Sequence, residues 1–538
     1  MDDHLKNNHI LKYFPWLAIG IILVATAFLR SSMLQMPLER DEGEYAYMGQ
    51  LLLQGIPPYL HAYSMKLPGL CAIYALFMGI FGQSILAIHL GLMIFNGIAI
   101  VLVFLLTRYF ADEISGVVAA LVYAILSVSP SVLGTVAHAT QFIVPLALGG
   151  LLLLLKAIDE RKTWLLIASG LLLGSSFLVK QHAVFFVLFA VFYYFSRMIR
   201  MSAAKGDTIS NTAILIVCSA LPFLTVCGLL YLAGVFPNFW FWTFSYSSQY
   251  ASETTISMAP EAFMHNAGIV VIYPWRLVWA IAGIGLSSIF WNEKMREHWD
   301  FWVGFPVFSF LSICPGFYFY LHYLVTLLPA VAMLSGIAVS SSMAYLSKRF
   351  SSYSKIIPVI FIIVALVLPA WQQKRFFCAS PIDASRMLYR ASNTFPESLT
   401  ISEYIRNHSS EKDTVAVLGS EPQIYFYANR KSATGYIYVY GLMESQPYAS
   451  QMQKEMIREI ESAQPKYIVF VNEELSWLIE PNSDRHIFLW SEKYLTDHYL
   501  LSGVMNTMSD LRINTNINSQ DTGLINNYNL SILVRKQQ

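Results

Sequence analysis

Long apolar segments alternate with short polar ones over the first 371 residues of the chain. Segments of this length with few charges are typical of transmembrane helices. The pattern therefore predicts a membrane all-α polytopic bundle of about eleven transmembrane helices. The predicted spans are 13–29, 84–107, 114–130, 142–156, 163–179, 183–197, 212–233, 275–291, 301–314, 321–340 and 356–371.

Two longer connections interrupt the membrane domain, which we expect to comprise residues 1–371. The first, 31–83, ends in a short apolar segment, 67–82, that predicts an interfacial or re-entrant helix. The second, 234–268, is rich in tryptophan and tyrosine. Such aromatic residues favour the lipid headgroup level. They predict an interfacial belt or, alternatively, a platform for a sugar ring or a lipid chain.

After residue 371 the pattern becomes that of a soluble domain. Helical stretches alternate with short β-type runs, an order that predicts a C-terminal soluble α/β domain over 372–538. No glycine-rich phosphate loop accompanies the strands, so we expect no nucleotide site. The predicted helices are 396–407, 422–429 and 444–463, and the predicted strands are 414–419, 466–471 and 530–535.

Composition supports the membrane assignment and excludes other classes. The chain is 56% apolar and 13% charged, whereas an average soluble domain is about 25% charged. The net charge of +1 and the dispersed basic residues exclude a nucleic-acid partner. The five cysteines form no C-x-x-C pair, so neither a disulfide framework nor a zinc site is expected.

The basic residues also predict the orientation. If the N-terminus is cytoplasmic, most lysines and arginines of the membrane domain fall in the inside connections, as the positive-inside rule requires. We therefore expect a multi-pass protein of the cell (inner) membrane. Its first outer connection and its C-terminal domain are expected to be extracytoplasmic, or periplasmic.

A charged cluster, Arg40 to Glu44, follows the first apolar segment. With Asp41 as N-cap and Glu44 three residues later, a capping box would account for two acids without any chemistry. It would not account for Glu42, and charge so close to a membrane is usually functional. On a helix Asp41 and Glu44 share a face with Tyr45, whereas Glu42 points about 100° away. We expect one acid, Asp41 or Glu42, to act as a proton-transfer group.

Further polar residues are expected at the outer ends of the apolar segments. A fixed ammonium at this depth suits a lipid-linked phosphate, although a lysine there can also simply extend to the headgroups. A lone histidine is more often a packed residue than a catalyst. The candidates are Lys66, Lys180, His138, Gln141, His322 and Tyr323.

The order of these motifs resembles that of GT-C class polytopic glycosyltransferases, most closely the bacterial protein mannosyltransferase and aminoarabinose transferase (glycosyltransferase family 39-like) group. Residues 41–46 are similar to an Asp-Glu-x-x-Tyr-Ala motif, and 66–68 to a Lys-Pro-Pro element. Residues 178–181 resemble a Leu-x-Lys-Gln turn, and 322–329 a His-Tyr-Leu-x-x-Leu-Leu-Pro element. Leu67 departs from the proline that the family often has.

The resemblance implies an integral membrane glycosyltransferase of the cell envelope. Such an enzyme moves a hexosyl or pentosyl group from a polyprenyl-phosphate-linked donor to a lipid, glycan or protein acceptor at the outer face, with inversion. It implies catalytic roles for Asp41, as general base, and for Glu42. It implies donor-phosphate binding by Lys66, Lys180, His322 and Tyr323, and an acceptor or pocket role for Tyr45, His138 and Gln141.

Fixed cations can neutralise a lipid monophosphate, so we predict neither a metal nor another cofactor. Two other classes remain open from the sequence. One is a polytopic transporter of a lipid-linked or small anionic solute, although such proteins often show inverted repeats that we do not find here. The other is a non-enzymatic membrane assembly protein.

Overall fold

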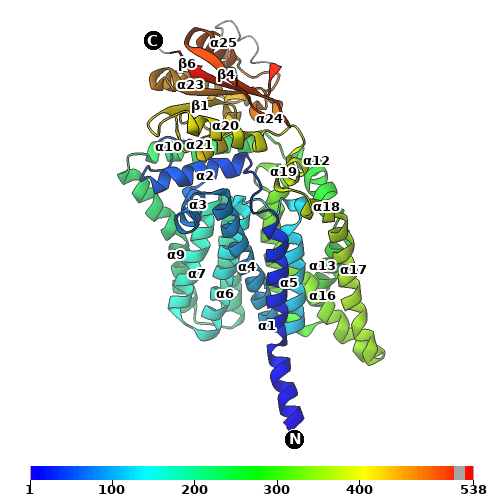
Figure 1. Ribbon diagram of the computed structural model, residues 1–538. Coiled ribbons are helices and arrows are strands. Elements are labelled where there is room, and N and C mark those ends of the chain that lie inside the picture. Colours follow the sequence, from blue (N-terminus) through cyan, green and yellow to red (C-terminus); the bar gives the residue numbers. More distant parts are fainter. Residues whose placement is uncertain (1, 514–526, 537–538) are drawn as a thin grey trace. The chain divides into compact units, whose positions relative to one another are not determined.

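The computed structural model describes residues 2–513 and 527–536, which form two compact units (Figure 1). The helical unit comprises Met1–Met33, His89–Gly228 and Ala251–Cys378. The sheet unit comprises Leu34–Ile88, Leu229–Tyr250 and Ala379–Gln538. The sheet unit therefore combines the C-terminal residues with the first long connection and part of the second.

The helical unit contains helices and short helical turns, of which α4, α9 and α11 each have one end in the sheet unit. They are α1 (Asp2–Ser31), α4 (Ile85–Phe110), α5 (Glu113–Val128), η1 (Pro130–Val132), α6 (Ala139–Glu160), α7 (Thr163–Val179), η2 (Gln181–Ala183), α8 (Val184–Arg200), α9 (Lys205–Leu232), α11 (Ser247–Ser252), α12 (Ala259–Ala262), η4 (Phe263–Ile272), α13 (Arg276–Ser287), η5 (Ser288–Phe290), α14 (Glu293–Glu297), α15 (Trp299–Leu311), η6 (Pro315–Phe317), η7 (Leu321–Thr326), α16 (Leu328–Arg349), η8 (Ser352–Lys355), α17 (Ile356–Gln372) and α18 (Lys374–Phe377).

Small residues hold α5, α16 and α13 close together. A Cβ atom at Gly336 of α16 would lie 2.2 Å from the backbone oxygen of Ser115, and one at Gly285 of α13 would lie 1.9 Å from that of Leu334. Glycine at these crossings lets the helix backbones approach directly, as in many membrane bundles.

Among the described residues, six helices are long and apolar enough to cross a membrane, and a seventh span results if α12–η4 and α13–η5, bent by 99°, are counted as one. The chain is a multi-pass membrane protein. The six are Tyr13–Ser31, Ile85–Phe110, Ala139–Glu160, Gln181–Arg200, Lys205–Leu232 and Leu328–Arg349.

The predicted number of eleven spans is not confirmed. Three of the predicted spans form helices of 16 or 17 residues, α5, α7 and α17. At 1.5 Å per residue they extend about 24–26 Å, short of a hydrocarbon core of about 30 Å. Predicted span 301–314 forms the 13-residue α15. Predicted span 275–291 is one arm of the bent pair.

The sheet unit contains six strands and eleven helical elements among its described residues. They are α2 (Arg40–Leu53), α3 (Pro68–Phe81), α10 (Phe236–Trp240), η3 (Phe241–Tyr246), α19 (Pro381–Tyr389), α20 (Phe395–Asn407), β1 (Thr414–Leu418), α21 (Gln423–Ala428), β2 (Lys431–Ser432), α22 (Tyr440–Met443), α23 (Ala449–Ala463), β3 (Tyr467–Val471), α24 (Glu474–Trp477), α25 (His486–His498), β4 (Tyr499–Met505), β5 (Arg512–Ile513) and β6 (Leu530–Arg535).

The strands form one mixed sheet in the order β2-β1-β3-β6-β4-β5. β1 is parallel to β2 and β3, whereas β6 is antiparallel to β3 and β4. β1 and β3 are almost continuously apolar and buried, as strands covered on both faces are. The predicted C-terminal sheet is thus present, and α20, β1, α21, β3 and β6 match their predicted segments closely. The sequence pattern did not indicate α25 and β4.

The second long connection, 234–268, is largely helical and not a loop as predicted, since α10, η3, α11, α12 and η4 lie within residues 236–272. Part of its aromatic content packs inside the protein. Trp242 stacks on Tyr63 with ring centroids 5.3 Å apart, and the Tyr246 hydroxyl donates a hydrogen bond to Glu444 at 2.5 Å. Those two aromatic side chains therefore do not form an interfacial belt.

Candidate functional site

The site residues predicted from the sequence fall into two groups, one in each unit. The sheet unit holds Asp41, Glu42 and Tyr45 on α2 and Lys66 just before α3. The remaining candidates belong to the helical unit. They are His138, Gln141, Lys180, His322 and Tyr323.

The capping box at the start of α2 differs from the predicted one. Glu39, not Asp41, is the N-cap: its side chain accepts a hydrogen bond from the Glu42 amide at 2.9 Å, and the Glu42 carboxylate accepts one from the Glu39 amide at 3.3 Å. Both Glu39/Glu42 and Asp41/Glu44 have the required spacing of three, and Asp is the better N-cap by preference. The helix begins two residues earlier than that preference indicates. Glu42 is thereby occupied at the helix terminus.

The four acids of this turn differ in exposure. Glu39, Glu42 and Glu44 are buried, whereas the Asp41 side chain is 19% exposed. The Asp41 Oδ2 atom lies 4.0 Å from the Nζ atom of Lys66, whose side chain is equally exposed. A carboxylate and an ammonium therefore sit together at the partly open start of α2.

Glu44 lies one helical turn after Asp41 and was not among the predicted site residues. Burial raises the pKa of Glu44 to about 7, opposed by the charge of Lys66 and by a hydrogen bond from Ser64, while the charge of Asp41 raises it further. Burial likewise raises the pKa of Glu39, reinforced by the charges of Asp41 and Glu42. The sequence signal that could have indicated Glu44 is its spacing from Asp41, which places the two acids on one face of the helix.

The loop before α3 fixes Lys66 through its backbone. The Tyr59 hydroxyl donates to the Lys66 carbonyl at 2.6 Å, and the Lys66 amide donates to the Ser64 hydroxyl at 3.0 Å. Tyr45 is 2% exposed and packs edge-on against Tyr74, with ring centroids 5.6 Å apart. The structure thus places Tyr45 in the packed interior of the sheet unit.

In the helical unit, Lys180 and Tyr323 come together. Lys180 follows α7 in an extended conformation, is 5% exposed, and places its Nζ atom 3.7 Å from the centre of the Tyr323 ring. This is a cation–π contact in a desolvated setting. His182 packs edge-on against the same ring at 4.7 Å, and its Nδ1 atom lies 2.9 Å from the Ser312 carbonyl.

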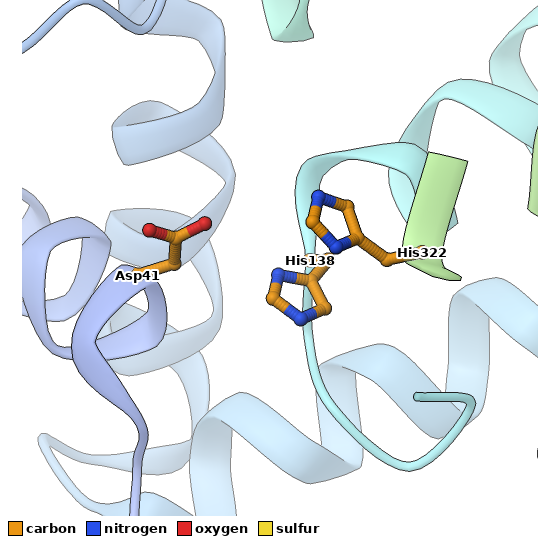
Figure 2. A group of neighbouring side chains, drawn as sticks. All are labelled: Asp41, His138 and His322. Atoms are coloured by element: carbon orange, nitrogen blue, oxygen red, sulfur yellow. The ribbon is translucent and has the colours of Figure 1, made fainter. Parts of the chain in front are cut away.

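His138 and His322 stack face to face, with ring centroids 4.0 Å apart (Figure 2). His138 is the residue before α6, and His322 lies in η7, where the Thr140 hydroxyl donates to its carbonyl at 2.7 Å. Tyr320 extends the stack on His322, and Tyr318 on Tyr320. The two tyrosines lie just before the 322–329 motif and were not among the candidates from the sequence.

Gln141 has a clear structural role. It is buried, and its Nε2 atom donates to the Gly134 carbonyl at 3.4 Å. Arg30 donates to the same carbonyl at 2.8 Å and to that of Ser127 at 3.1 Å. Gln141 therefore helps to hold the turn before α6.

Several of these side chains are of types that bind divalent metals, namely imidazole nitrogens and carboxylate oxygens. That the reaction needs no metal stays a prediction. A polar cleft of about 450 Å³ also lies in the sheet unit, lined by His61, Glu455 and Arg458 among others, and none of the predicted site residues lines it.

Comparison with protein families supports the resemblance. Residues 66–225 match the family described as dolichyl-phosphate-mannose-protein mannosyltransferase. The match covers less than half of the chain. No curated protein sequence matches significantly.

Solved structures share the fold. ArnT from Cupriavidus metallidurans bound to undecaprenyl phosphate is 11% identical with a TM-score of 0.58, over 96% of this chain and 97% of that one. Its apo form is 12% identical, with the same TM-score and the same coverage of the two chains. The oligosaccharyltransferase AglB from Archaeoglobus fulgidus, with an inhibitory peptide and a dolichol-phosphate, is 13% identical with a TM-score of 0.56, over 94% of this chain and 74% of that one. The predicted resemblance to GT-C glycosyltransferases is confirmed at the level of fold.

Proposed function

We propose that this protein is an inverting membrane glycosyltransferase that takes a sugar from a polyprenyl-phosphate-linked donor, with Asp41 as general base. The observation that carries the proposal is the difference in hydrogen bonding and exposure among the four acids at the start of α2. Glu42 is occupied in the capping box, Glu39 and Glu44 are buried, and Asp41 alone of the four is partly exposed, beside Lys66. The fold shared with lipid-phosphate-binding transferases supports it.

In the proposed step the acceptor hydroxyl attacks the anomeric carbon of the donor. A new bond forms from the acceptor oxygen to that carbon, and the bond from the carbon to the phosphate oxygen breaks. The hydroxyl proton moves to a carboxylate oxygen of Asp41, and the polyprenyl phosphate leaves with the bonding electrons. General-base catalysis of this kind typically contributes about 10² to 10⁴ in rate.

Cationic and hydrogen-bonding side chains would bind the donor phosphate and stabilise the charge that it gains. Lys66 is the candidate in the sheet unit, where its Nζ atom lies 4.0 Å from the Asp41 Oδ2 atom. Lys180, His322 and Tyr323 are the candidates in the helical unit. An ammonium in a water-poor setting stabilises developing negative charge more strongly than it does in bulk water.

The test is Asp41→Asn in purified, lipid-reconstituted protein, assayed for sugar release from a polyprenyl-phosphate donor. We expect kcat to fall by about 10² to 10⁴, since the amide cannot accept the proton. Glu411→Gln, at an exposed position of the sheet unit, is the matched control and should retain full activity. Activity of Asp41→Asn close to wild type would contradict the base assignment. Wild-type protein that turns over no such donor but moves solute across vesicles would favour a transporter.

A further inference from the structure

The residue before the proposed base is held by the C-terminal sheet. Arg40 is buried, and its Nη2 atom lies 3.2 Å from Glu421 Oε1 and 4.0 Å from Glu473 Oε2. Glu421 follows β1 and Glu473 follows β3, two adjacent parallel strands whose carboxyl ends meet at one edge of the sheet. Open α/β sheets commonly bind their ligands at this edge. In this protein the Arg40 side chain of α2 lies at this edge of the sheet.

Polar and aromatic side chains of the C-terminal domain surround the Arg40–Glu421 ion pair. The second oxygen of Glu421 accepts a hydrogen bond from the Ser476 hydroxyl at 2.6 Å, and Oε1 accepts a weaker one from Thr394 at 3.3 Å. The Phe395 ring lies 5.1 Å from the centre of the guanidinium. A buried arginine is stable only when it is paired and hydrogen-bonded in this way. The ion pair therefore restricts where the first turn of α2 can lie.

Further contacts fix α2 along its length. A Cβ atom at Gly43 would lie 2.6 Å from the Gln423 amide nitrogen, so α2 and α21 are in backbone contact. The Tyr47 hydroxyl accepts a hydrogen bond from the Ser432 amide at 2.8 Å. These residues come from α21 and β2, both part of the C-terminal domain. α2 is therefore packed as a component of that domain.

We propose that the C-terminal domain positions the general base: Glu421 and Glu473, acting through Arg40, hold the first turn of α2 so that Asp41 is correctly placed for proton transfer. This inference rests on the proposed function. It assigns Glu421, Glu473 and Arg40 as positioning residues that touch neither substrate nor reacting atoms. The C-terminal domain would accordingly be part of the catalytic unit, whatever else it binds.

The principal test is Glu421→Gln in the full-length protein, with two measurements. We expect kcat to fall 10- to 100-fold with KM for the donor within twofold of wild type. We also expect the amide protons in the first two turns of α2, which include the Gly43 amide bonded to the Glu39 carbonyl at 2.8 Å, to exchange at least tenfold faster. Glu397→Gln is the matched control, since it removes another buried carboxylate of the domain, paired with Arg386. It should change neither quantity.

A milder variant keeps the test decisive if Glu421→Gln fails to fold. Ser476→Ala removes one hydrogen bond to Glu421 and should lower kcat three- to tenfold, with a smaller rise in exchange. Unchanged exchange in α2 would overturn the inference whatever the activity, and so would faster exchange with unchanged kcat. An inactive wild-type protein in which Glu421→Gln still accelerates exchange would refute the proposed function while supporting the contact itself.

Discussion

The burial of Glu44, one helical turn from the proposed base, predicts that its carboxyl has a raised pKa and makes stability depend on pH. Glu44 is 4% exposed, and burial raises the pKa of its carboxyl from 4.5 to about 7. Such a shift corresponds to about 3 kcal/mol between the two protonation states. Replacement by glutamine keeps the size of the side chain and fixes it in a neutral form.

The direction in which the unfolding free energy changes with pH follows from proton linkage. Because the folded-state pKa is raised, the folded protein binds this proton more tightly than the unfolded chain does. The stabilisation is fully present below pH 4.5 and is lost as the pH rises to about 7. From pH 4.5 to pH 8 the wild-type protein should therefore lose about 3 kcal/mol of unfolding free energy that Glu44→Gln does not lose.

Two measurements check this prediction. Difference infrared spectroscopy of wild-type protein should show a carboxylic-acid carbonyl band that titrates with a midpoint near 7 and is missing in Glu44→Gln. Denaturant unfolding of both proteins in detergent at several pH values should show the flatter profile of the variant. A midpoint near the ordinary value of 4.5, or parallel stability profiles, would refute the reasoning from burial.

Two further predictions concern packing and orientation. Gly43→Ala should destabilise the protein by about 1–3 kcal/mol, because the new methyl group would overpack against Gln423. The control is Gly79→Ala, whose new methyl group would meet a side chain at 3.7 Å and should not destabilise the protein. Thermal unfolding of the two variants is the measurement. Cysteines at the exposed positions Ala204 and Glu411 test the proposed topology. In a Cys378→Ser background, which removes the exposed native thiol, an impermeant thiol reagent should label only Glu411→Cys in intact cells. Labelling of Ala204→Cys alone would contradict the orientation.

The sequence pattern predicted the central strands of the sheet and the positions of most membrane helices, because both depend mainly on local sequence. β1 and β3 are short runs rich in β-branched residues, which fit a pleated, buried surface, and their almost continuous apolar character is typical of strands covered on both faces. The apolar segments likewise marked the positions of most membrane helices. Their lengths were less predictable, because where each helix ends depends on its packing partners. The break between η4 and α13, for example, divides one apolar segment by a 99° bend.

The contacts that organise the candidate site join residues remote in sequence. Arg40 and Glu421 are 381 positions apart, and Thr140 bonds to His322 over 182 positions. A single sequence carries no local signal for such pairs. It offered Arg40 as one more charge near a membrane and Glu421 as an ordinary acid after a strand. Only the fold shows that the two neutralise each other in a buried site.

The order of residues in the first turn of α2 explains how one short segment serves several partners. Successive side chains on a helix diverge by about 100°. Arg40 can therefore face the sheet edge while Asp41, the next residue, faces Lys66, and Glu42 turns back to cap the helix. Because the helix is rigid, the buried ion pair of the first residue constrains the direction of the second. The charge cluster is thus best understood as one proposed base with the groups that orient it, and not as several equivalent acids.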